Sequence, residues 1–61
     1  MLNISVIIPA YNVQDFIRES VNSVLKFKEI KEIIIIEDNS TDNTYQICLS
    51  LSKEFNKVKL F

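Results

Sequence analysis

Residues 33–40 read IIIIEDNS, in which four isoleucines run directly into a polar turn. Successive side chains of a strand point to opposite faces, so a run of isoleucines places apolar side chains on both faces. Strands of this kind are typical of the middle of a parallel sheet whose two faces are covered by helices. We therefore expect a central strand over residues 32–37, with helices above and below it.

A second apolar run lies near the start of the sequence. Residues 4–8 read ISVII, which contains no charge, and Pro9 follows them. Proline has no N–H to donate to a sheet. We therefore expect the first strand to end there and the chain to turn outward through Ala10, Tyr11 and Asn12.

The next segment has the spacing of an amphipathic helix. Asn12 and Asp15 resemble a capping box, with Asp in place of the usual Glu or Gln, so the helix should begin near Val13. A 3.6-residue period predicts an apolar face of Val13, Ile17, Val21, Val24 and Leu25, with Phe16 beside it. A charged connection over residues 27–31 then leads to the isoleucine strand.

A second helix is expected after the isoleucine strand. Residues 38–43 are DNSTDN, six turn-forming and capping residues in a row. Ser40 or Thr41 should be the N-cap, with Asp42 in the first helical turn, where a negative charge suits the helix dipole. The predicted helical stripe consists of Tyr45, Cys48, Leu49, Ser52 and Phe55.

The chain closes with a third strand. Residues 57–61 alternate polar and apolar side chains, with Val58 and Leu60 inward. The order β-α-β-α-β separates the strands too far for hairpins, so we expect an α/β fold with a parallel sheet and right-handed crossovers. Ligands of such open sheets bind beyond the carboxyl ends of the strands. The polar turns after the first two strands should meet at that edge.

Composition limits the class of protein. A chain of 61 residues forms at most one small domain, and its net charge of −1 favours neither a nucleic-acid groove nor a membrane-binding face. It has no apolar run of the ~18 residues that a membrane span needs, and Met1-Leu2-Asn3 has no basic character typical of a signal peptide. We therefore expect a cytoplasmic chain.

Composition also limits the kind of site. The sequence has no glycine, which sets aside the glycine-rich dinucleotide fingerprint and the P-loop. With no histidine and one cysteine, these residues form neither a zinc site nor a histidine-based triad. We interpret the single cysteine, Cys48, as a small core residue in a reducing compartment.

Asp38 and Tyr11 have the chemistry of nucleoside ligands. Asp38 leaves a central strand close to a helix start, where backbone N–H groups are unpaired, so its carboxylate can stay ionised and accept from a heterocyclic N–H or ribose hydroxyls. Tyr11 offers a flat face for a base, and Pro9 and Ala10 present backbone groups without bulky side chains. The same spacing is equally compatible with a simple helix cap at residues 38–40 and a loop aromatic over the core.

Two stretches in register resemble a known family. ISVIIPAYNVQDFIRESVNSVL (residues 4–25), followed by EIIIIEDNSTDNT (residues 32–44), is similar to the opening of family 2 of the inverting, nucleotide-sugar-dependent glycosyltransferases with the GT-A fold. In that family a strand ending in Pro-x-Tyr-Asn is followed, after one helix, by a strand ending in an acidic pair. The resemblance implies that residues 1–61 are the N-terminal, nucleotide-binding part of a truncated, Rossmann-like GT-A domain.

The resemblance also implies site residues. The nucleoside site would be lined by Pro9, Ala10, Tyr11 and Asp38, with Asn12 and Glu37 as secondary members. Asp38, the second residue of the acidic pair, would bind the base, usually uracil. Glu37 stands where the family more often has Asp, and Asn39 where Gly is frequent.

The family's reaction transfers a sugar from a nucleotide sugar, most often a UDP-sugar, to an acceptor hydroxyl. A carboxylate base deprotonates the acceptor, and a divalent metal, Mn or Mg, neutralises the leaving diphosphate. The family's metal-binding Asp-x-Asp motif and catalytic base have no counterpart in these residues, so we assign no catalytic or metal residue. The isolated chain is expected to be inactive.

Two alternatives remain open from the sequence. The acidic turn also resembles the magnesium pocket of a receiver-like, phosphate-accepting signalling module, although such a pocket should follow the first strand of the chain. The other alternative is a non-catalytic α/β oligomerisation module, because an unfinished sheet leaves unpaired backbone groups at its edge. Self-association or strand exchange is expected for any of these functions.

Overall fold

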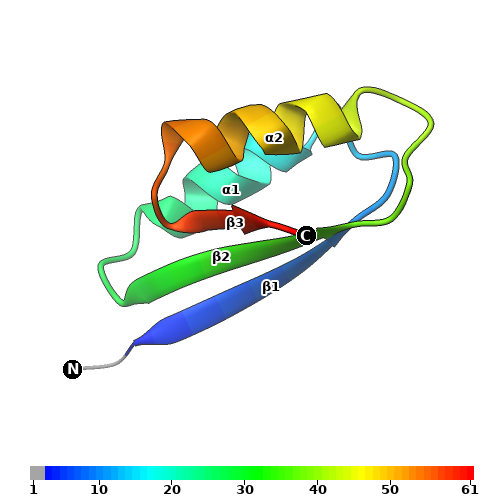
Figure 1. The fold of residues 1–61 in the computed structure, drawn as a ribbon. Helices are drawn as coiled ribbons and strands as arrows, with labels where there is room; N and C mark the ends of the chain where they lie inside the picture. Colours follow the sequence, from blue (N-terminus) through cyan, green and yellow to red (C-terminus); the bar gives the residue numbers. More distant parts are fainter. Residues whose placement is uncertain (1–2) are drawn as a thin grey trace.

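The computed structural model describes residues 3–61. Its elements, in chain order, are β1 (Ile4–Ala10), α1 (Ile17–Leu25), β2 (Ile30–Glu37), α2 (Thr44–Glu54) and β3 (Val58–Leu60) (Figure 1). The strands are parallel and lie in the order β1-β2-β3, which makes β2 the central strand. The predicted α/β fold is confirmed. Met1 and Leu2, on which the expected absence of a signal peptide partly rests, lie outside the described residues.

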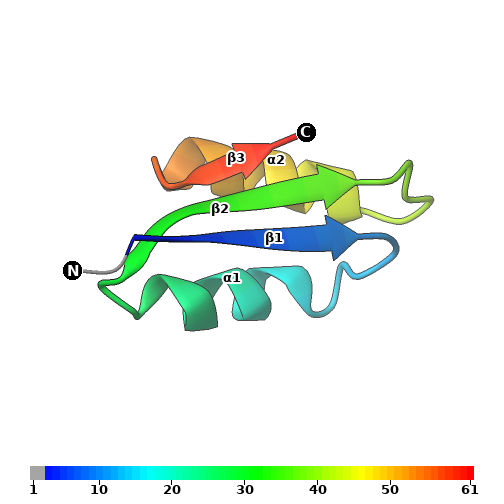
Figure 2. The same ribbon diagram turned by 90° about the horizontal axis from the view of Figure 1, so that it is seen from below.

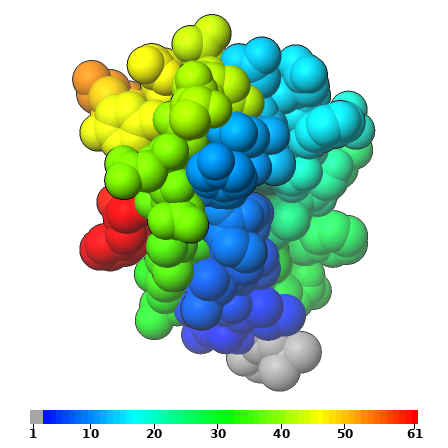
Figure 3. Space-filling view, turned by 90° about the vertical axis from the view of Figure 1, so that its right-hand side faces the viewer, coloured from blue at the N-terminus to red at the C-terminus, as the bar shows by residue number. Residues whose placement is uncertain are grey.

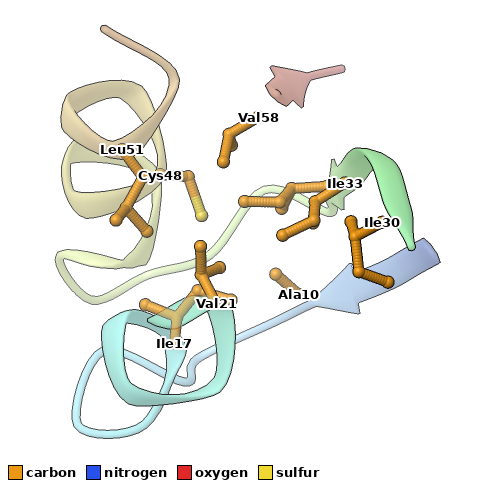
Figure 4. Packing of buried hydrophobic residues seen from close by; sticks show 9 residues of the cluster. Ala10, Ile17, Val21, Ile30, Ile33, Cys48, Leu51 and Val58 are labelled. Atoms are coloured by element: carbon orange, nitrogen blue, oxygen red, sulfur yellow. The ribbon is translucent and has the colours of Figure 1, made fainter. Parts of the chain in front are cut away.

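One hydrophobic core lies between the sheet and the two helices (Figure 4). Ile33 and Ile35 of β2 are fully buried in it, whereas Ile36 is 48% exposed and Ile7 of β1 is 62% exposed. The buried apolar residues are Ala10, Ile17, Val21, Ile30, Ile33, Ile35, Cys48, Leu51 and Val58. Both helices therefore cover the same face of the sheet, and within residues 3–61 the other face is uncovered.

The expectation of helices on both faces of the sheet is wrong. Each crossover moves one strand further in the same direction, from β1 to β2 to β3. Two crossovers of the same hand that advance in the same direction place their helices on the same side of the sheet. Half of the isoleucine run therefore faces away from the core. Self-association through this surface stays a prediction.

β1 continues through Pro9 to Ala10, beyond the predicted end of the strand. The carbonyl of Ala10 accepts a hydrogen bond from the N–H of Asp38 (3.0 Å), so the backbone groups of Ala10 face β2. Neighbouring residues of a strand point their backbone groups to opposite sides. The nitrogen of Pro9 therefore points to the outer edge of β1, where a missing N–H breaks no ladder bond.

α1 begins at Ile17 rather than near Val13. The N–H groups of Phe16 and Ile17 both donate to the carbonyl of Val13 (2.9 Å each), which forms a turn before the helix. The predicted capping box is wrong, because the side chain of Asn12 is bonded to another loop. The predicted apolar face is confirmed, since Ile17 and Val21 are buried and Val13, Val24 and Leu25 pack partly buried against the core. Phe16 is exposed.

α2 and β2 also differ in detail from the prediction. α2 begins at Thr44, after an N-cap at Asn43, and buries Thr44, Cys48 and Leu51, while Tyr45 and Leu49 are exposed. The predicted N-cap is therefore wrong, as are Tyr45 and Leu49 of the predicted stripe, whereas Cys48 is buried and Phe55 packs partly buried against the core, as predicted. β2 starts earlier than predicted, at Ile30. β3 has its inward residues as predicted, with Val58 buried and Leu60 partly buried.

Neither helix within residues 3–61 combines the length and apolar character that crossing a bilayer requires.

Candidate nucleoside site at the carboxyl edge of the sheet

β1 and β2 end together at one edge of the sheet. Ala10 pairs with Glu37, and the N–H of Asp38 donates to the carbonyl of Ala10 at 3.0 Å. Tyr11 and Asp38 are therefore the first residues that leave the two strands at this edge. Figure 2 shows both loops beyond the tips of the parallel strands. The expectation that the polar turns meet at a common edge is confirmed.

The predicted site residues differ in their access to a ligand. Tyr11 is 55% exposed and Asp38 is exposed, so both side chains are free to contact a small molecule. Pro9 is exposed on β1. The side chain of Ala10 belongs to the buried core, and its carbonyl is already bonded to Asp38. Only the backbone of Ala10 reaches this edge.

The two loops that follow β1 and β2 are hydrogen-bonded to each other, and they lie side by side in Figure 3 (light blue and yellow-green). The N–H of Asn12 donates to Ser40 Oγ at 3.0 Å. Asn12 Oδ1 accepts from the N–H of Thr41 at 2.9 Å and from its hydroxyl at 3.3 Å. Asn12 thus contributes both its backbone and its side chain to the contact.

Further hydrogen bonds join the two loops next to Asn12. The N–H of Val13 donates to Thr44 Oγ1 (2.8 Å), which is buried. The N–H of Gln14 donates to Asp42 Oδ2 (3.3 Å), and Gln14 Oε1 accepts from the N–H of Asn43 (3.0 Å). We call the bonds made across the two loops by Asn12, Val13, Gln14, Ser40, Thr41, Asp42, Asn43 and Thr44 the inter-loop network. The sequence pattern predicts several of these side chains as helix caps instead.

The backbone takes the left-handed conformation once in each loop. Asn12 has φ 52° and Asn39 has φ 56°, and the chain has no glycine for such positions. Asparagine tolerates this region better than most residues other than glycine. Each of these asparagines directly follows an exposed candidate residue, Tyr11 or Asp38.

The carboxylate of Glu37 is hydrogen-bonded within the turn after β2. Its Oε2 accepts from the N–H of Ser40 at 2.7 Å, and its Oε1 accepts from the N–H of Asn39 at 3.1 Å. Hydrogen bonds from Ser40, and to a smaller extent from Asn39, hold the pKa of the Glu37 carboxyl below its ordinary value. Glu37 therefore shapes the loop that carries Asp38.

Protonation of Glu37 at acidic pH should lower the stability of the fold. Because its pKa is lowered by folding, its contribution to stability is complete above the ordinary value of 4.5 and is lost as pH falls through the folded pKa. Glu37→Gln removes the ionised acceptor, so the urea midpoint, followed by circular dichroism, should fall less steeply with acid below pH 4.5 than in the unchanged chain. An unchanged slope would contradict this role of Glu37.

The residues at this edge do not fit a metal site. Within residues 3–61, no group of three or more acidic, cysteine or histidine side chains is arranged to hold an ion. The oxygens of Glu37 and Asp42 instead accept backbone N–H groups of the two loops.

A hollow that the sequence did not indicate lies beside the loop after β2. It measures about 490 Å³ and is lined by Glu37, Asn39, Ser40, Asp42, Tyr45, Gln46 and Phe61. Tyr11 and Asp38 are not part of its lining. The hollow therefore differs from the exposed surface of Tyr11 and Asp38, although Glu37 and Asn39 of its lining flank Asp38 in the sequence.

Known proteins match this chain along most of its length. The family described as glycosyl transferase family 2 matches residues 5–61. The minor teichoic acid biosynthesis protein GgaA of Bacillus subtilis is 43% identical over 92% of the chain, which corresponds to 14% of that protein. The dolichyl-phosphate beta-glucosyltransferase of Saccharomyces cerevisiae is 41% identical over 90% of the chain, which corresponds to 18% of that enzyme.

A third relative is an enzyme of Campylobacter jejuni, the GalNAc(5)-diNAcBac-PP-undecaprenol beta-1,3-glucosyltransferase. It is 35% identical over the whole chain, which spans 20% of the enzyme. The receiver-like alternative is not supported, because the acidic pair follows the second strand and the family match covers both polar loops. The chain belongs to glycosyltransferase family 2.

Proposed function

We propose that this chain supplies the nucleoside-binding part of an inverting glycosyltransferase, which transfers a sugar from a UDP-sugar to an acceptor hydroxyl. The observation that supports it most is the hydrogen bond from the N–H of Asp38 to the carbonyl of Ala10, 3.0 Å long. Through it, two exposed side chains of complementary chemistry, Tyr11 and Asp38, leave adjacent strands at the same edge. Family membership supplies the reaction class.

The proposed roles follow from the chemistry of uracil. The phenol ring of Tyr11 stacks on the base, a contact worth ~1–3 kcal/mol per base in nucleic-acid complexes. The carboxylate of Asp38 accepts a hydrogen bond from uracil N3–H. Cytosine presents an acceptor at N3, so a carboxylate in this place repels it. The backbone of Pro9 and Ala10 forms the floor of the site.

The sugar transfer itself is assigned to no residue of this chain. The chain spans a fifth or less of the length of the three relatives described above. Residues 3–61 do not fit the divalent metal that the family is expected to use with the diphosphate. We propose that residues 1–61 alone bind a nucleotide without transferring its sugar.

Amide NMR spectra of the 61-residue chain, titrated with UDP, test this proposal. Saturable shifts at Tyr11 and Asp38 are expected, with a dissociation constant of about 1 mM, which corresponds to ~4 kcal/mol of binding free energy. CDP, with its N3 acceptor, should cause smaller shifts at the same concentration. Spectra that stay unchanged at millimolar UDP would contradict the proposed function.

A further inference from the structure

We infer that Asn12 is a positioning residue for the nucleoside site, one that holds Tyr11 in place beside Asp38 without itself contacting the base. The inference rests on the proposed function and concerns the inter-loop network. Its basis is the different way in which the two left-handed asparagines, Asn12 and Asn39, are held.

Asn39 is held within its own loop. Its N–H donates to Glu37 Oε1 at 3.1 Å, two residues back in the chain. That bond belongs to the backbone of Asn39, so it survives replacement of the side chain. Asp38 therefore lies in a turn that is held by a hydrogen bond within its own loop.

Asn12 is held by the opposite loop. Its side-chain Oδ1 accepts from both the N–H and the hydroxyl of Thr41, while its own N–H donates to Ser40 Oγ. These partners lie 28 and 29 residues away in the sequence. The direction in which the chain leaves Tyr11 is thus fixed by the loop that begins at Asp38.

Loss of the Asn12 side chain should loosen the two loops without unfolding the chain. The bonds of Val13 and Gln14 to the second loop remain, and so does the buried core. The measured dissociation constant equals the intrinsic one divided by the fraction of molecules with the site assembled. If that fraction falls to about a tenth, the dissociation constant for UDP rises about tenfold.

The test compares Asn12→Gly with Asn39→Gly. Glycine adopts a left-handed φ without strain, so both variants keep the backbone geometry, and only Asn12→Gly removes an inter-loop acceptor. Asn12→Gly should weaken UDP binding about tenfold, measured at a temperature where circular dichroism shows both variants folded. Asn39→Gly should bind UDP within about twofold of the unchanged chain, because the side chain it removes makes no hydrogen bond in the inter-loop network.

Two further measurements separate positioning from a general loss of stability. In the free protein, hydrogen exchange at the amide of Thr41, the donor to Asn12 Oδ1, should quicken in Asn12→Gly, while exchange in the core of β2 stays as it was. The double variant Asn12→Gly with Asp38→Ala should lose less UDP-binding free energy than the sum of the two single losses, because the placement of Tyr11 beside Asp38 no longer matters once the carboxylate is gone.

The outcomes distinguish this inference from the proposed function. Normal UDP binding by Asn12→Gly would overturn the positioning role and leave the proposed function intact. Additive losses in the double variant, or unchanged exchange at Thr41, would also overturn it. Failure of the unchanged chain to bind UDP would overturn both together.

Discussion

Ile33→Ala is expected to remove most of the chain's stability against unfolding at 25 °C. Ile33 is fully buried on the central strand, beneath both helices. Truncation of such a side chain costs ~2–5 kcal/mol, through lost burial and the cavity left behind. A single small core supplies roughly 3–5 kcal/mol at this chain length, so little stability remains. Urea unfolding followed by circular dichroism measures the loss.

Ile36→Ala is the matched control for this prediction. It makes the same substitution on the same strand, but Ile36 is 48% exposed on the uncovered face. We expect it to cost less than about 1 kcal/mol, in the range of surface positions. Equal losses for the two variants would contradict the finding that both helices lie on one face of the sheet.

Asp38→Ala is expected to have the largest effect on binding. A hydrogen bond to a charged group contributes ~1.5–3 kcal/mol, so loss of the carboxylate should weaken UDP binding by roughly ten- to a hundredfold. Because Asp38 is exposed, the fold should keep its stability. Isothermal calorimetry or amide NMR of the folded variant measures the change.

Asp15→Ala serves as the control for charge at this edge. Asp15 is also an exposed aspartate and follows β1 in the neighbouring loop. Its removal changes the net charge by the same amount as Asp38→Ala but should leave UDP binding within about twofold, since an exposed charge acts weakly through water. If both variants weakened UDP binding equally, Asp38 would act only through the long-range electrostatic field of its charge.

The sequence predicted the fold because its strongest signals are local. The runs at residues 4–8 and 33–36 fix two strands, and the helical period between them fixes a crossover, so the parallel order and the common edge of Tyr11 and Asp38 follow. Which faces of the sheet the helices cover does not follow from these local signals. Ile34 and Ile36 are as apolar as Ile33 and Ile35, and the direction of the second crossover decides whether α2 covers the same face as α1 and so leaves the face of Ile36 uncovered.

The errors at the helix starts have a different physical cause. Asn12, Ser40 and Thr41 have the composition of helix caps, but their bonds run across the two loops, between residues 28 or 29 positions apart. A local pattern cannot distinguish a side chain that caps its own helix from one that bonds to a distant loop. The signal that could have indicated the network is the excess of polar residues in the second turn over what one cap requires.

The place where UDP binds on the chain can be located by NMR. Intermolecular nuclear Overhauser effects between uracil H5 or H6 and the ring protons of Tyr11 report whether the base stacks where we propose. We expect these effects, together with a shift of the Asp38 amide. Contacts to Tyr45 and Phe61 would instead place the nucleotide in the hollow beside the loop after β2, and would contradict a base stacked on Tyr11.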